Sequence, residues 1–440
     1  MLISQAKIVN EGRTVEGDVL IKRGRIEKIA PFIAAPPRTK VIDARGKLLL
    51  PGVIDDQVHF REPGFPEKGD IASESAAAVA GGTTSFMDMP NTNPQTVTHE
   101  ALAAKYEAAH GRAFANHAFY FGATNDNVEL VAKLRKNQAC GVKIFMGAST
   151  GNMLVDDPAT LDKIFARCPL PITTHCESTP MIKANEAKAR EKYGDAVPVT
   201  EHPNIRSAEV CYASSELAVR LAKQHGARLH VLHLTTAREL ELFEPGPVTG
   251  KKITCEACVH HLWFNDTAYK TLGNKVKCNP AIKTEADRKG LLQGLKEGRV
   301  DIIATDHAPH TAEEKARPYL EAPSGLPVIQ HSLLMMLELV KRGELDLHTV
   351  VIKTSHAVAE RFGIKERGYI REGLWADLVL VDPKTPTAVT RESLKYRCGW
   401  SPFEGEEFSS SIVATWVSGE LAYSEGQVHP RPHGKKLDFV

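Results

Sequence analysis

Eight short apolar runs alternate with helical patterns through the middle of the chain. Runs of this length, rich in Val, Ile and Thr, are typical of strands buried in a parallel sheet. Helical patterns such as ESAAAVAGG and PATLDKIFARC fill most of the gaps between them. Eight alternating units predict an α/β fold, a (β/α)8 TIM barrel over residues 51–365. The runs cover residues 53–59, 83–89, 117–122, 141–146, 171–176, 228–233, 251–256 and 301–306.

The two ends of the chain have a different pattern. DVLIKRGRIEKIA indicates two strands with a turn at Arg23–Gly24, and IVATWVSGELAY indicates two more with a turn at Ser418–Gly419. We therefore predict that residues 1–50 and 366–440 form one small composite β-sandwich domain. The long gap between the fifth and sixth barrel runs predicts an inserted pair of helices.

Composition narrows the class of protein. The 440 residues are 42% hydrophobic and carry a formal net charge of +1, which gives no indication of nucleic-acid or membrane binding. No run is long enough to span a bilayer, and no signal peptide is recognisable. The eight cysteines are scattered, which favours reduced thiols over disulfides. These features predict a cytoplasmic protein that acts on a small molecule.

Polar side chains recur at the downstream ends of five of the apolar runs. Because the carboxyl ends of barrel strands meet at one rim, imidazoles, an amine and a carboxylate there predict a single metal site. One strand-end histidine alone is weak evidence, since it is as often a hydrogen-bonded core residue; the combination is much stronger. The predicted ligands are His59, Lys143, His175, His233 and Asp306.

Lys143 requires its own explanation, because a buried ammonium is costly and would repel a nearby cation. A neutral amine instead reacts with carbon dioxide to give a carbamate, whose two oxygens can bridge two cations. The alternative is a lysine paired with a buried carboxylate. Other histidines are interpreted as structural: His230 lies on the opposite face from His233, His307 is a packing or supporting residue, and His260–His261 are given little weight as ligands.

Further polar residues are predicted at the same mouth. Gln57, His59 and Arg61 share one face of the first strand, and Arg61 is suited to bind a carboxylate. Asn91 and Asn279, in loops after the second and seventh strands, supply amides, although Asn–Pro loops are usually only turns. Asp306 is placed both to bind a metal and to carry a proton, and His310 lies where it could contact substrate.

Four motifs together resemble the amidohydrolase superfamily, in its cyclic-amidase branch, and within that branch the dihydroorotases. They are HFREPG (59–64), FMDMPNTNP (86–94), CNPAIK (278–283) and TDHAPH (305–310). The resemblance covers essentially the whole chain. It implies zinc, one or two ions per chain, and catalysis by Asp306. It also implies that Arg61 and Asn91 hold a substrate carboxylate, that Asn279 and His310 contact substrate, and that the protein is a homo-oligomer, a dimer.

The chain departs from the family pattern at Gln57, where the first histidine of His-x-His normally stands. A glutamine oxygen is a neutral and weaker zinc ligand, so one metal position is expected to be weak, altered or empty. The run GVKIFMG resembles the branch whose bridging group is a carboxylated lysine, which implies N6-carboxylation of Lys143.

Two alternatives remain open. Hydantoinases, dihydropyrimidinases and allantoinases share the fold and metals, but their substrates lack the ring carboxylate, which makes Arg61 the discriminating residue. A catalytically silent dihydroorotase-like structural subunit is the second alternative, and Gln57 is the feature that favours it. The function best matched by the motifs is reversible cyclisation of N-carbamoyl-L-aspartate to dihydroorotate, a step of pyrimidine biosynthesis.

Overall fold

The computed structural model describes residues 1–147 and 153–440. The middle of the chain forms eight parallel strand positions, the third of which is split into β8 and β9. Strands β6, β7 and β8 pair in that order, and β9 to β14 pair in sequence order in a second sheet. The bounds are β6 Val53–Val58, β7 Thr83–Asp88, β8 Asn116–Phe119, β9 Phe121–Gly122, β10 Val142–Phe145, β11 Ile172–His175, β12 Leu229–Val231, β13 Ile253–Cys258 and β14 Ile302–Ala304.

The last strand position returns to the first and closes the barrel. Val58 forms a parallel bridge with His307, and the His59 amide donates to the His307 carbonyl at 2.7 Å. Sequential parallel pairing with closure is the arrangement of a (β/α)8 barrel, so the predicted fold class is confirmed.

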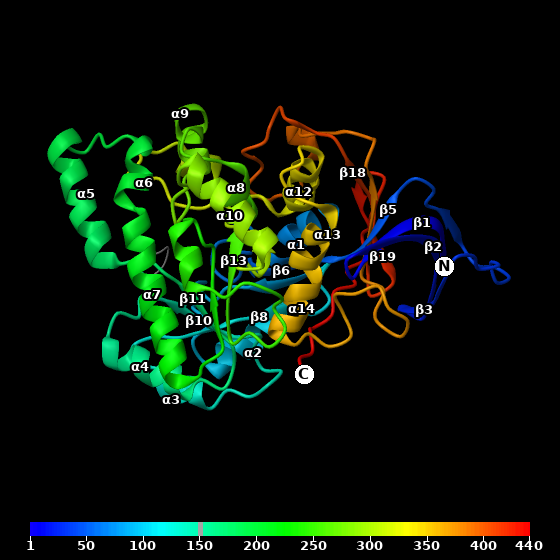
Figure 1. Cartoon of the computed structure of the whole chain (residues 1–440), viewed down its shortest axis with the longest axis horizontal. Helices are drawn as coiled ribbons and strands as arrows, with labels where there is room; N and C mark the ends of the chain where they lie inside the picture. Colours follow the sequence, from blue (N-terminus) through cyan, green and yellow to red (C-terminus); the bar gives the residue numbers. More distant parts are fainter. Residues whose placement is uncertain (148–152) are drawn as a thin grey trace.

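Helices surround the barrel and fill the connections (Figure 1). The predicted insertion between β11 and β12 holds α5 and α7, with the short α6 between them; α5, α6 and α7 lie together at the left of Figure 1. The helices are α1 Ile71–Ala80, α2 His99–Ala109, α3 Val128–Ala132, α4 Pro158–Arg167, α5 Thr179–Tyr193, α6 His202–Ile205, α7 Ala208–His225, α8 Val259–Trp263, α9 Ala268–Leu272, α10 Glu285–Glu297, α11 Ala312–Lys315, α12 Ser332–Lys341, α13 Leu347–Val351 and α14 Ala357–Phe362.

The strands from both chain ends form one nine-stranded sheet with a core cluster of its own. Its order is β20-β19-β18-β15-β5-β1-β2-β3, with β4 paired to β1, so blue and red strands lie side by side in Figure 1. The boundaries 1–50 and 366–440 stay a prediction. The strands are β1 Leu2–Asn10, β2 Arg13–Lys22, β3 Arg25–Ala30, β4 Val41–Asp43, β5 Leu48–Pro51, β15 Leu378–Asp382, β18 Ser411–Val417, β19 Glu420–Ser424 and β20 Gln427–Val428; β16 Thr387–Ala388 and β17 Glu407–Phe408 pair separately.

A single residue, Gly52, joins the terminal sheet to the barrel. It follows β5 and precedes β6, and a Cβ atom at this position would lie 2.2 Å from Thr84 Oγ1. Only glycine lets the chain pass this close to β7. The sheet and the first barrel strand are therefore one continuous piece of backbone.

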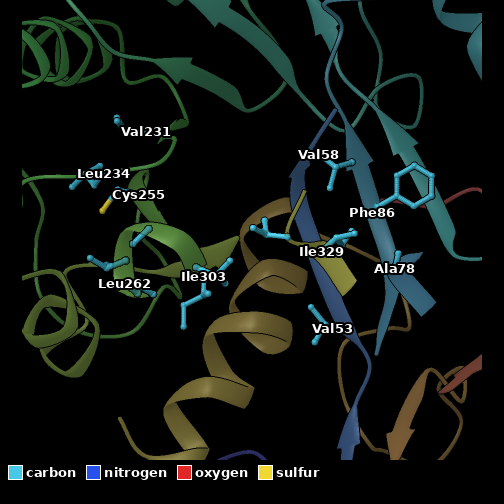
Figure 2. Close-up of a cluster of buried hydrophobic side chains, with 14 of the residues drawn as sticks. Val53, Val58, Ala78, Phe86, Val231, Leu234, Cys255, Leu262, Ile303 and Ile329 are labelled. Atoms are coloured by element: carbon cyan, nitrogen blue, oxygen red, sulfur yellow. The ribbon is translucent and has the colours of Figure 1, made fainter. Parts of the chain in front are cut away.

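Buried apolar side chains fill the space between the barrel strands and the surrounding helices. Figure 2 shows Val53 and Val58 on β6, Phe86 on β7 and Ile303 on β14 within this cluster. In the part of the chain that the structure describes, none of the helices has the length and apolar character needed to cross a membrane.

Candidate active site

The predicted ligands converge on one cavity at the rim formed by the strand ends. His59 follows β6 directly, Lys143 lies within β10 and His175 ends β11; His233 and Asp306 lie two residues beyond β12 and β14. The cavity has a volume of about 30 Å³, enough for an ion or a water molecule. Its lining consists of Gln57, His59, Arg61, Asn91, Lys143, Phe145, His175, His233, Asn279, Asp306, Ala308, Ser324 and Gly325.

Two buried imidazoles face each other in this cavity. His175 Nδ1 lies 3.0 Å from His233 Nε2, and His175 Nε2 lies 2.8 Å from a carboxylate oxygen of Glu177. Because Glu177 accepts the Nε2–H, His175 directs the electron pair of Nδ1 toward His233. Burial lowers the pKa of both histidines, so both rings are neutral at pH 7 and able to bind a metal. Arg206 forms an ion pair with Glu177 behind them.

Two hydrogen-bonding side chains contact the carboxylate of Asp306. His59 Nδ1 lies 2.8 Å from Asn91 Oδ1 and donates to it, which turns His59 Nε2 toward Asp306 Oδ1 at 3.1 Å. The Gln57 amide also donates to this oxygen at 3.1 Å. Burial raises the pKa of Asp306, but the hydrogen bond and charge of His59 outweigh it and hold the pKa below its usual value. Asp306 is therefore an anion at neutral pH.

Lys143 is buried without a counter-ion among the described residues. Lys143 is 1% exposed, and its Nζ lies over the face of the Phe145 ring, 4.6 Å from the ring centroid. Burial lowers the pKa of Lys143 to about 8. A substantial fraction of the amine is therefore neutral near physiological pH, which is the form that reacts with carbon dioxide. The alternative expected from the sequence, a direct pair with a buried carboxylate, is not present in the described part of the chain.

The nitrogen and oxygen atoms that line the cavity suit a divalent cation as ligands. Imidazole nitrogens and carboxylate oxygens are the ligands that zinc takes in catalytic sites, and the hydrogen bond to Glu177 directs the electron pair of His175 into the cavity. Burial lowers the pKa of His59, and in its neutral form, with the proton on Nδ1 toward Asn91, Nε2 can also bind an ion. Gln57 differs from an imidazole in this respect. Its amide nitrogen is engaged with Asp306 and its oxygen lies 3.6 Å from the Cys258 thiol.

Arg61 enters the cavity from the β6 side and is fixed at its base. Its Nε donates to the Pro309 carbonyl at 2.9 Å, and Nη2 lies 3.0 Å from His310 Nε2. His310 is 1% exposed and is not among the lining residues, so it contacts Arg61 rather than the cavity itself. Asn279 does line the cavity, and its Oδ1 is buried with no hydrogen-bond donor among the described residues.

Three cavity residues have a left-handed backbone conformation that non-glycine residues rarely adopt. The φ angles are +67° for Arg61, +39° for His233 and +47° for Asp306. Each such conformation costs on the order of 1 kcal/mol, and such residues concentrate at functional sites. In each case the strand has ended and the strained residue turns its side chain toward the cavity.

Two clusters of buried polar side chains lie outside the cavity lining. Both include histidines interpreted from the sequence as structural or given little weight as ligands. His260, His261 and Cys278 place one donor atom each within 4.8 Å of one another, and so do Asp56, His230 and Glu256. Neither ring nitrogen of His260 has a hydrogen-bond partner among the described residues. Sequence reasoning did not select Asp56 or Glu256; the available signal was a carboxylate in the middle of the runs VIDDQV and ITCEAC.

Comparisons with known proteins agree with this architecture. The Amidohydrolase family model matches residues 48–422. A dihydroorotase from Halobacterium salinarum is 35% identical over 359 residues, covering 81% of this chain and 82% of the relative. An allantoinase from Bacillus velezensis is 31% identical, covering 97% and 94%. The solved L-hydantoinase from Arthrobacter aurescens has a TM-score of 0.93 at 26% identity and covers 99% of both chains.

The matched region contains the barrel and, from the terminal sheet, β5, β15, β18 and part of β19. The resemblance expected from the four motifs is thus confirmed, as is the expected class of enzyme, a hydrolase. Amidohydrolases generally depend on metals, and the donor set at the barrel rim suits that chemistry. On the family match and the coverage of its relatives, this chain belongs to the amidohydrolase family.

Proposed function

We propose that this protein is a dihydroorotase, which interconverts N-carbamoyl-L-aspartate and dihydroorotate. The observation that carries the proposal is a guanidinium, Arg61, on the wall of the same cavity as the imidazoles of His175 and His233. A planar guanidinium can bind a carboxylate through two parallel hydrogen bonds, and dihydroorotate has a ring carboxylate. Several dihydroorotases at about one-third identity support the same substrate.

The proposed cofactor is zinc, one or two ions per chain. His175 and His233 would hold one ion, and His59 and Asp306 would contribute to a second position, which Gln57 serves less well than an imidazole. Lys143 as a carbamate would supply an anion with two oxygens to both positions. Carboxylation forms a bond from Nζ to the carbon of carbon dioxide and releases one proton. A bound ion supplies Lewis acidity that activates water and polarises the ring carbonyl.

The protein's own groups orient the substrate and move the proton. Arg61 and Asn91 bind the ring carboxylate and so fix the scissile amide over the cavity. Asp306, an anion at neutral pH, accepts a proton from water as the C–N bond breaks and returns it to the departing ring nitrogen. His59 and Gln57, which both contact Asp306 Oδ1, keep the carboxylate in place. Cyclisation uses the same groups in reverse order.

His310 has a supporting part in this proposal. Its Nε2 lies 3.0 Å from both Arg61 Nη2 and the Ser324 carbonyl oxygen, and burial lowers its pKa to about 3. It therefore stays neutral and orients the guanidinium without competing for the substrate carboxylate. Asn279, with its unpartnered buried oxygen, is placed to accept a hydrogen bond from a ring N–H.

A substrate panel tests the proposal. Turnover of dihydroorotate, dihydrouracil, hydantoin and allantoin is measured on one preparation whose metal content is also determined. We expect dihydroorotate to give the highest kcat/KM, and Arg61→Met to raise its KM by roughly 10–100-fold, the effect of losing hydrogen bonds to a charged group. A preference for an uncharged ring would contradict the proposal.

A cyclic amidase that acts on a ring without a carboxylate is the second candidate. The Arthrobacter hydantoinase superimposes over nearly the whole chain, and the Bacillus allantoinase is almost as similar in sequence as the dihydroorotases. Arg61 distinguishes the candidates, because an uncharged ring would cover the buried guanidinium without supplying a carboxylate to balance its charge. A silent subunit would purify without metal and turn over none of the four substrates. We also propose a cytoplasmic homodimer, which a molar-mass measurement would test.

A further inference from the structure

Three charged or ionisable side chains meet inside the barrel, away from the cavity lining. Asp56 lies on β6, His230 on β12 and Glu256 on β13, and all three residues have at most 1% exposure. His230 Nε2 is 3.0 Å from Glu256 Oε2 and 3.3 Å from Asp56 Oδ2. The three donor atoms lie within 4.8 Å of one another. We call these residues the inner cluster; none of them lines the rim cavity.

The hydrogen bonds around His230 define which of its nitrogens carries a proton. Thr254 Oγ1 donates to the Leu229 carbonyl at 3.3 Å, so it accepts from His230 Nδ1–H at 2.8 Å. Burial opposes protonation of His230, but the close contacts and negative charges of Asp56 and Glu256 raise its pKa to about 9, so Nε2 also carries a proton in the metal-free protein. Two buried carboxylates need a positive charge between them, and a divalent cation can take the place of this proton.

Asp56 is weakly supported for a buried carboxylate, because the contact of its Oδ2 is with His230 Nε2 at 3.3 Å. Neither of its carboxylate oxygens accepts a hydrogen bond from the described residues, although Asp56 is 0% exposed. The nearby Tyr120 hydroxyl donates to the backbone carbonyl of Asp56 and leaves the carboxylate unsatisfied. Buried carboxylates in proteins are normally hydrogen-bonded, paired or bound to a metal.

A second buried histidine–carboxylate pair in this barrel shows the contrast. His307 Nε2 lies 2.8 Å from Glu74 Oε2, and its Nδ1 accepts from the Val328 amide at 3.1 Å. The proton is therefore on Nε2 and is donated to a single carboxylate. That pair is complete as an ordinary hydrogen bond, whereas the inner cluster has a second carboxylate on the same imidazole nitrogen.

We propose that Asp56, His230 and Glu256 bind a divalent cation of the zinc type, at a site separate from the rim cavity. The ion would displace the Nε2 proton of His230, and the two carboxylates and neutral imidazole that remain would cancel its charge. With metal–ligand distances of about 2.0 Å, neighbouring ligands of a tetrahedral ion lie roughly 3.3 Å apart, close to the spacings around His230. The ion would link β6 to β12 and β13 across the barrel. Its ligand Asp56 directly precedes Gln57 in the sequence.

This inference concerns a structural site and does not depend on which cyclic amide is the substrate. Glu256 is already oriented for it, because its Oε1 accepts from the His233 amide at 3.2 Å and leaves Oε2 for the ion. A cation here would lie close in sequence to the position where Gln57 weakens the rim site. The chain would thus hold one ion in the barrel interior in addition to those at the rim.

Anomalous diffraction at the zinc edge from crystals of the zinc-loaded wild-type protein tests the proposal. We expect a peak between Asp56, His230 and Glu256, resolved from any peak in the rim cavity. The absence of a peak there overturns the proposal, whatever the rim holds, and would mean that protons alone neutralise the inner cluster. Failure of the dihydroorotase assay would leave this result unaffected.

Metal counting on variants gives the same test in solution. Asp56→Asn keeps the side-chain shape and should lose one zinc equivalent per chain relative to wild type. Glu74→Gln removes a buried carboxylate from the complete His307 pair and serves as the matched control, with unchanged zinc content. Equal zinc content in a folded Asp56→Asn protein, judged by circular dichroism, would refute the site. If that variant does not fold, the diffraction result decides alone.

Discussion

Glu177 should control metal affinity although it does not line the cavity. Its carboxylate accepts the Nε2–H of His175 at 2.8 Å, and burial in the absence of partners would raise its pKa. Arg206 and His175 instead lower the pKa to about 2, so Glu177 is an anion that fixes the His175 tautomer and makes Nδ1 a better donor. Glu177→Gln removes the negative charge at nearly constant volume.

The expected loss follows from that geometry. The glutamine oxygen can still accept from His175, so the tautomer survives, but the negative charge behind His175 and the ion pair with Arg206 are lost. Changes to such supporting groups weaken metal binding by about 10–100-fold, which is roughly 1.4–2.7 kcal/mol. Zinc dissociation constants are measured by competition with a coloured chelator, with kcat determined separately at saturating zinc.

Glu74→Gln is the matched control for this prediction. Glu74 also accepts from a buried histidine at 2.8 Å, but His307 is not among the cavity residues. The control should lower the melting temperature while leaving the zinc affinity within about threefold of wild type. A zinc affinity of Glu177→Gln that equals the wild-type value would show that His175 needs no anionic support, and would remove the basis for treating it as a ligand.

Three further changes have defined outcomes. Asp306→Asn should lower kcat in both directions by roughly 10²–10⁴-fold, because the proton carrier is lost, and a metal-loaded variant with near-normal turnover would mean that Asp306 is not the base. Arg61→Lys should raise KM for dihydroorotate with a smaller change in kcat, since an ammonium cannot form the bidentate pair; unchanged steady-state constants would argue against carboxylate binding. Lys315 donates to the carbonyls of Lys277, Pro323 and Gly325, and burial lowers its pKa to about 7. In the unfolded chain the Lys315 amine keeps its proton to a higher pH than in the folded protein. The free energy of unfolding should therefore rise between pH 7 and 9 by up to about 1.4 kcal/mol per pH unit, and Lys315→Met should lose that slope in denaturant titrations.

The barrel was predictable because its strands are buried on both faces and therefore consist mainly of consecutive apolar residues. The same logic located His59, His175 and Asp306, since polar residues at the ends of several such runs are brought together at one rim. The strand ends themselves were less predictable. The sixth run extends to His233, yet β12 stops at Val231 because the backbone turns to a positive φ at His233.

The supporting contacts could not be predicted from the sequence. Glu177 was recognisable only as the residue after a strand, and its contacts depend on Arg206, 29 residues away along the chain. The expectation that His310 contacts substrate stays a prediction, and its contacts with Arg61 and the Ser324 carbonyl had no signal in the sequence. The inner cluster joins three strands far apart in sequence, and no local pattern reports which residues of one strand face those of another.

The terminal sheet has a consequence for synthesis of the chain. Its neighbouring strands β5 and β15 come from opposite ends of the sequence. Pro51 of β5 pairs with Leu378 of β15, and these residues are 327 positions apart. Until the ribosome has made the last strands, β5 presents an open hydrogen-bonding edge next to a barrel that is already forming. Such an edge invites pairing with another nascent chain. A C-terminal truncation before residue 378 should therefore yield aggregates rather than a free barrel.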